Sequence, residues 1–188
     1  MTKLYIALVD TPGLFAYLIR KFTGINYNHV ALSLDPELEE VYTFGRRWLP
    51  VTFFAGFIRE RRDKVLRKYP FARYKIISID CTAEQKDRIH KNLKTCYEQR
   101  FRYHYSVIGL PFLVADIPFY LKNHYTCSSF LARILEDNEI ILFDKHFSLV
   151  TPRDFYELPE NGTLYEGYLS DFVCPSLRYW KEEHVYGT

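Results

Sequence analysis

Residues 125–135 decide the fold, and they read YTCSSFLARIL. Thr126 stands directly before an apolar run with helical spacing, which is typical of a helix N-cap. We therefore expect a helix over about residues 127–137. Its inner face should carry Phe130, Leu131, Ile134 and Leu135. Cys127 would open this helix, where free backbone N–H groups and the helix dipole favour a thiolate.

A predicted strand at residues 28–34 supplies a partner for this thiol. Alternation along the strand places His29, Ala31 and Ser33 on one face and Val30, Leu32 and Leu34 on the other. His29 thus lies opposite the strongly apolar face. A thiol with a pKa of about 8.5 needs a base at neutral pH, and His29 can be that base. The plainer interpretation is a buried packing cysteine and a hydrogen-bonded structural histidine.

A third group should orient the imidazole, and the next predicted strand, at residues 41–44, offers candidates. Glu40 is favoured as a carboxylate, and Tyr42 shares its face. Thr43 lies on the other face with Val41. The residue types alone leave this choice open.

The remaining pattern predicts an α+β fold in one domain over residues 1–188, with a central, mainly antiparallel sheet and helices packed on it. Strands are expected at 3–9, 73–80 and 164–173. A helix should start at Thr11-Pro12, carry Leu14, Leu18 and Phe22 at helical spacing, and end at Gly24. Thr82 and Gln85 form a capping box for a helix over 83–100. Residues 103–121 are expected to be a lid or a short buried helix, and Thr151-Pro152 should start a helix reaching about residue 158.

Composition excludes several classes of function. The net charge of +2 gives no case for a nucleic-acid partner. The four cysteines have no zinc-like spacing, so no metal or cofactor is implied, and reduced thiols favour the cytoplasm. The start of the chain lacks a secretory layout, and no run of about 20 apolar residues could span a membrane. The basic run 59–75 is either a solvated surface or an anion-binding patch, which leaves peripheral membrane contact open.

Two segments together resemble the circularly permuted branch of the NlpC-type papain-like superfamily. The first is a helix followed by TGINYNHVALS at residues 23–33, and the second is YTCSSFLARIL at 125–135. That branch includes the YiiX/YaeF-like bacterial proteins and, more distantly, the lecithin:retinol acyltransferase-like enzymes. The resemblance implies a permuted papain-like domain with Cys127 as nucleophile, His29 as base and Thr43 aligned at the third position. Members of the YiiX type tend to carry a glutamate there.

The resemblance implies a cysteine hydrolase that works through a covalent acyl-enzyme. Three functions compete. The first is an amidase or peptidase acting on small peptides or cell-wall fragments, and the second is a lipid-directed thioesterase or acyltransferase. The second gains support from the apolar residues 103–121 and the basic run 59–75. The third is a non-catalytic binding domain that keeps the fold.

Overall fold

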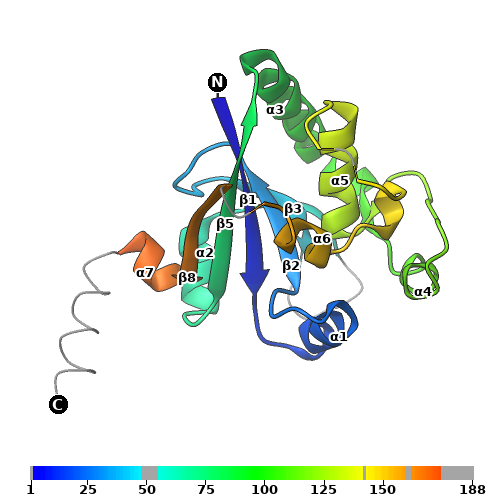
Figure 1. Cartoon of the computed structure of the whole chain (residues 1–188), viewed down its shortest axis with the longest axis horizontal. Coiled ribbons are helices and arrows are strands. Elements are labelled where there is room, and N and C mark those ends of the chain that lie inside the picture. The colour runs from blue at the N-terminus through cyan, green and yellow to red at the C-terminus, as the bar shows by residue number, and fades with distance from the viewer. Residues whose placement is uncertain (1, 48–54, 142, 160–161, 175–188) are drawn as a thin grey trace.

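A curved β-sheet forms the centre of the computed structural model, which describes residues 2–47, 55–141, 143–159 and 162–174 (Figure 1). Its strands are β1 (Thr2–Asp10), β2 (His29–Ser33), β3 (Val41–Arg46), β4 (Ala55–Glu60), β5 (Arg73–Cys81), β6 (His104–Tyr105), β7 (His124–Tyr125) and β8 (Thr163–Tyr168). In the described part of the chain these eight strands follow the order β7-β6-β4-β3-β2-β1-β5-β8. All neighbours are antiparallel except β6 and β7. The predicted α+β class with a mainly antiparallel sheet is confirmed.

Helices cover both faces of the sheet. They are α1 (Leu14–Thr23), α2 (Arg62–Lys68), α3 (Ala83–Glu98), α4 (Leu110–Val114), α5 (Cys127–Asp137), α6 (Pro152–Tyr156) and α7 (Leu169–Val173). Helices α3, α5 and α6 pack on one face, whereas α2 and α7 lie against the other (Figure 1). Among the described residues, none of these helices has the length and apolar character needed to cross a membrane.

Because side chains alternate along each strand, the sheet has a separate hydrophobic core on each of its two faces. Along β1, Leu4, Ile6 and Leu8 point to the α5 side, and Ala7 and Val9 point to the α2 side. Both faces of the central strands are therefore buried, which explains why β1 is a nearly continuous apolar run. Strand β2 divides in the same way, as its sequence predicted.

The first helix differs from its prediction at its start and on its surface. Thr11 does not cap it, because α1 begins after Gly13 and the Thr11 hydroxyl accepts a hydrogen bond from Asn28 Nδ2 at 3.3 Å instead. Gly24 ends the helix as expected, in the left-handed region at φ 71°. The stripe of Leu14, Leu18 and Phe22 points outward and is exposed. An apolar stripe of this kind usually packs on a core.

Three other segments depart from the sequence expectations. Strand β4 and helix α2 form where no element was predicted. The expected strand 164–173 divides into β8 and α7. The capping box of Thr82 and Gln85 is confirmed, and its helix ends at Glu98. Cys174, near the end of the described residues, is exposed.

Candidate active site

The first turn of α5 positions Cys127. Thr126 Oγ1 accepts the Ser129 N–H at 3.1 Å, and Ser129 Oγ accepts the Thr126 N–H at 2.9 Å. This reciprocal cap satisfies two of the N–H groups that a helix start leaves free. Ser128 Oγ donates to the carbonyl of Val150 at 2.6 Å and so ties the same turn to the following loop. Cys127 is therefore held rigidly, and its side chain is only 3% exposed.

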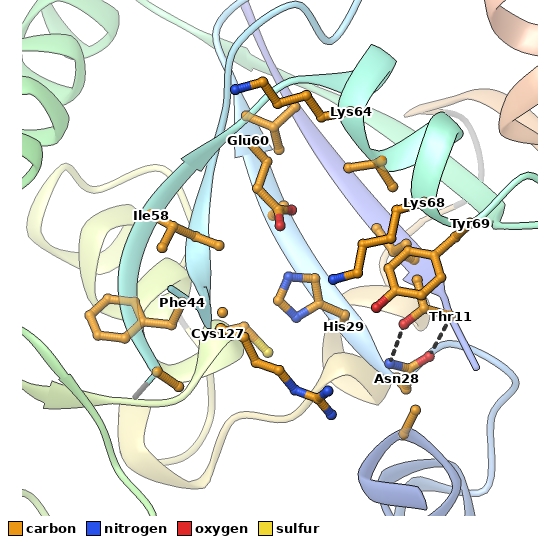
Figure 2. A pocket seen from close by; sticks show the side chains of 18 of the residues that line it. Thr11, Asn28, His29, Phe44, Ile58, Glu60, Lys64, Lys68, Tyr69 and Cys127 are labelled. Carbon is orange, nitrogen blue, oxygen red and sulfur yellow. Dashed lines mark hydrogen bonds between the residues drawn. The ribbon is translucent and has the colours of Figure 1, made fainter. Parts of the chain in front are cut away.

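The start of β2 positions His29. Asn28, directly before it, donates its backbone N–H to the Val9 carbonyl at 3.0 Å. The Asn28 side chain also contacts Thr11 through two hydrogen bonds, which are drawn in Figure 2. These bonds fix the strand end from which the half-buried His29 ring projects into a cavity.

Thr43 contacts His29 from the neighbouring strand β3. Its hydroxyl lies 3.1 Å from His29 Nε2 and 2.8 Å from the carbonyl oxygen of Val30. The hydroxyl has one hydrogen, which goes to the carbonyl because a carbonyl can only accept. Thr43 must then accept a hydrogen from Nε2–H. This arrangement selects the imidazole tautomer with a free lone pair on Nδ1, which is the form a general base needs.

The other two candidates for the third position point elsewhere. The Tyr42 hydroxyl donates to Glu40 Oε2 at 3.1 Å, and Arg59 Nη1 forms an ion pair with Glu40 Oε1 at 3.0 Å. Glu40 and Tyr42 thus interact with each other and with Arg59. Of the three candidates, the structure brings only Thr43 to the His29 ring.

The Cys127 sulfur lies beside the start of β2. The backbone N–H groups of Val30, the residue after His29, and of Ser128 and Cys127 itself act on the thiol and lower its pKa. Figure 2 shows the sulfur directed toward the His29 ring. Both side chains line one cavity of about 510 Å³. Two residues that are 98 positions apart in the sequence therefore face the same space.

Burial keeps both groups neutral. Desolvation raises the pKa of the Cys127 thiol, although the three backbone N–H groups oppose this change. Desolvation also lowers the pKa of His29 to about 4. At pH 7 the pair is consequently a thiol and a neutral imidazole. This result corrects the expectation of a depressed thiol pKa, because burial outweighs the helix N-terminus.

The cavity walls contribute residues that the sequence did not single out. Tyr105 on β6 lies close enough to Cys127 for the charge of a thiolate to raise the tyrosine pKa further, beyond the effect of burial. Glu60 and Lys68 extend toward the His29 ring from the opposite wall (Figure 2). Burial raises the pKa of Glu60, and the nearby Lys68 charge lowers it. Only the tertiary fold brings these residues together, so no local signal could have identified them.

The cavity combines an apolar floor with a cationic wall. The apolar part includes Val9, Ala31, Leu38, Val41, Ile58 and Val65. The cationic part comes from the start of the basic run and includes Arg61, Arg62, Lys64 and Lys68. Within the described residues, no group of three or more histidine, cysteine or acidic side chains could hold a metal ion.

Comparisons with known proteins add no assignment. No protein-family model matches the chain, and no curated protein or solved structure matches it. The site must therefore be interpreted from its own geometry.

Proposed function

We propose that the protein is a cysteine acyl hydrolase or acyltransferase in which Cys127 is the nucleophile, His29 the general base and Thr43 the residue that orients the base. The observation that carries this proposal is the hydrogen-bond chain from the Val30 carbonyl through Thr43 to His29 Nε2. That chain leaves Nδ1 as the basic atom beside the cavity that Cys127 also lines.

The proposed reaction begins from the neutral pair. His29 Nδ1 takes the proton of Cys127 while the sulfur forms a bond to the carbonyl carbon of an ester, thioester or amide. The carbonyl oxygen gains the negative charge, and the free N–H groups at the start of α5 stabilise it. His29 then gives its proton to the leaving group, and the bond between the carbonyl carbon and that group breaks. A thioester with Cys127 remains.

The second half of the reaction releases the acyl group. Water, or an acceptor alcohol or amine, gives a proton to His29 Nδ1 and attacks the thioester carbonyl. Collapse of the intermediate returns the proton to the Cys127 sulfur. Water as the acceptor yields hydrolysis, and any other acceptor yields acyl transfer. Thr43 carries no charge, so the imidazolium that forms in each half receives orientation without an ion pair.

The cavity favours an acyl-lipid type of substrate. An apolar floor suits a hydrocarbon chain, and the wall with Arg61, Lys64 and Lys68 suits a negatively charged headgroup. A small peptide or cell-wall fragment is the second candidate, and it rests on the resemblance of residues 23–33 and 125–135 to the permuted papain-like proteins. The permuted papain-like arrangement is itself part of this proposal.

A substrate panel tests the function. Fatty-acyl thioesters, acyl esters with a phosphate headgroup and short peptide amides are incubated with the wild type and with Cys127→Ala. We expect turnover of the acyl esters or thioesters that is lost in the variant. Turnover of peptide amides alone would favour the second candidate. Turnover that persists in Cys127→Ala would refute both, as would a complete absence of turnover across the panel.

A further inference from the structure

The outer face of α1 is apolar although nothing in the described structure covers it. Leu14 is 77% exposed and Leu18 is 52% exposed, and Tyr17 and Phe22 are exposed beside them. Spacings of three and four residues place these side chains on one side of the helix. Ala16 on the opposite side is buried and lines the Cys127 cavity. The helix thus buries Ala16 against the fold and presents four large apolar side chains to solvent.

A second segment has the same character. In residues 107–121, Ile108 is 64% exposed and Val114 is 65% exposed, and Ile117 and Leu121 are exposed as well. This segment contains α4 and lies at the same end of the molecule as α1 (Figure 1). Val107, at the start of this segment, lines the Cys127 cavity together with Ala16 and Ile19 of α1. Exposed apolar side chains from two segments at one end of a protein indicate an interaction surface.

Charge around these segments favours an anionic partner. The sequence has no acidic residue from position 11 to position 34, and residues 107–123 contain one, Asp116. Lys21 in the last turn of α1 and Lys122 after the second segment are both exposed. The cationic wall of α2 borders the same cavity. A partner with a purely apolar surface would gain nothing from this shortage of acidic residues and these exposed lysines.

We propose that α1 and residues 107–121 form a docking face for an anionic lipid bilayer. The exposed side chains of Leu14, Leu18, Ile108 and Val114 enter the boundary between headgroups and acyl chains, and Tyr17 lies at the level of the headgroups. Lys21 and Lys122 contact lipid phosphates. The Cys127 cavity then opens beside the membrane. This docking needs no thiol chemistry, so it stands or fails separately from the proposed function.

Vesicle binding tests the docking face, and the chain offers a matched control. The full chain is sedimented with vesicles of phosphatidylcholine alone and with vesicles that also contain phosphatidylglycerol. Leu18→Glu places a charge on the docking face. Leu164→Glu places the same charge on β8, at a leucine that is 51% exposed. Both positions are on the surface, and circular dichroism checks that both variants keep their fold.

We expect the wild type to bind the phosphatidylglycerol vesicles more tightly than the neutral ones, with an affinity that falls as salt rises. Leu18→Glu should lower the affinity by about tenfold or more, and Leu164→Glu should leave it unchanged. Cys127→Ala should bind like the wild type. Equal losses in the two glutamate variants would overturn the proposal, as would no binding to either vesicle. So would a wild-type dimer that Leu18→Glu converts to a monomer without any vesicle binding, because the face would then join two copies of the chain.

Discussion

Removing the Thr43 hydroxyl tests how the site is oriented. Thr43→Val keeps the shape of this fully buried side chain but eliminates two hydrogen bonds, to Val30 and to His29. A typical hydrogen bond contributes about 1 kcal/mol, and a buried group left without a partner costs about 1–3 kcal/mol. We therefore expect the free energy of unfolding to fall by about 2 kcal/mol. For a chain of this size, that corresponds to a decrease in Tm of about 4–8 °C.

The same change should slow acylation of Cys127. Without the Thr43 acceptor, neither the tautomer nor the ring position of His29 is fixed. General-base catalysis contributes about 10²- to 10⁴-fold, so losing the orientation but keeping the base should cost about 10- to 100-fold. Thr43→Ser is the matched control because it keeps the hydroxyl and loses only a methyl group. Calorimetry gives Tm, and release of p-nitrophenol from an acyl ester gives the acylation rate.

Two results would show that the Thr43 hydroxyl does not orient His29. One is Thr43→Val with wild-type Tm and wild-type acylation. The other is Thr43→Ser with losses as large as those of Thr43→Val, since packing of the methyl group rather than the hydroxyl would then matter.

Three further predictions concern pH, reactivity and packing. The pKa of His29 is about 4 in the folded protein and 6.5 in the unfolded chain, so the unfolded chain binds more protons between these two pH values. The free energy of unfolding should therefore fall by at most about 3 kcal/mol as the pH drops from 6.5 to 4. Urea unfolding across this range should show the loss in wild type and not in His29→Gln, and a flat wild-type curve would contradict it. Iodoacetamide at pH 7 should modify the exposed Cys174 before Cys127, because burial raises the pKa of the Cys127 thiol. Peptide mass mapping identifies the modified cysteine. Rapid alkylation of Cys127 at pH 7 would contradict a neutral thiol. Leu131 is fully buried on α5, so Leu131→Ala should lower the free energy of unfolding by about 2–5 kcal/mol in urea titrations. A loss below about 1 kcal/mol would show that this core is not closely packed.

Local signals were sufficient to predict the element that carries Cys127. The cap at Thr126 and the apolar spacing after it lie within one short segment, and α5 spans Cys127–Asp137 as expected. Alternation along β2 placed His29 opposite the apolar face for the same reason. These patterns depend only on neighbouring residues.

The partners of His29 could not be predicted in this way. The choice among Glu40, Tyr42 and Thr43 depends on the register of β2 against β3, and their ladder pairs Leu32 with Tyr42. A carboxylate is the stronger orienter in general, but Glu40 lies before the first residue of β3 and interacts with Arg59 instead. Register is a property of the sheet, which the composition of one strand does not reveal.

Burial explains the remaining differences. The helix N-terminus alone predicts a lowered pKa for Cys127, but the surrounding sheet and helices desolvate the thiol and raise it. The stripe of Leu14, Leu18 and Phe22 has the spacing of a core-facing helix, and only the position of α1 at the edge of the fold leaves it exposed. In both cases the local pattern is present, and the tertiary environment determines its effect.

Formation of an acyl-enzyme on Cys127 would show directly whether this thiol is the nucleophile. The protein is mixed with p-nitrophenyl octanoate at pH 7, quenched in acid, digested and analysed by mass spectrometry. We expect an octanoyl group on Cys127 that forms far more slowly in His29→Ala, with little modification of the exposed Cys174. No adduct on Cys127, or an adduct that forms equally fast in His29→Ala, would show that Cys127 and His29 do not act as nucleophile and base.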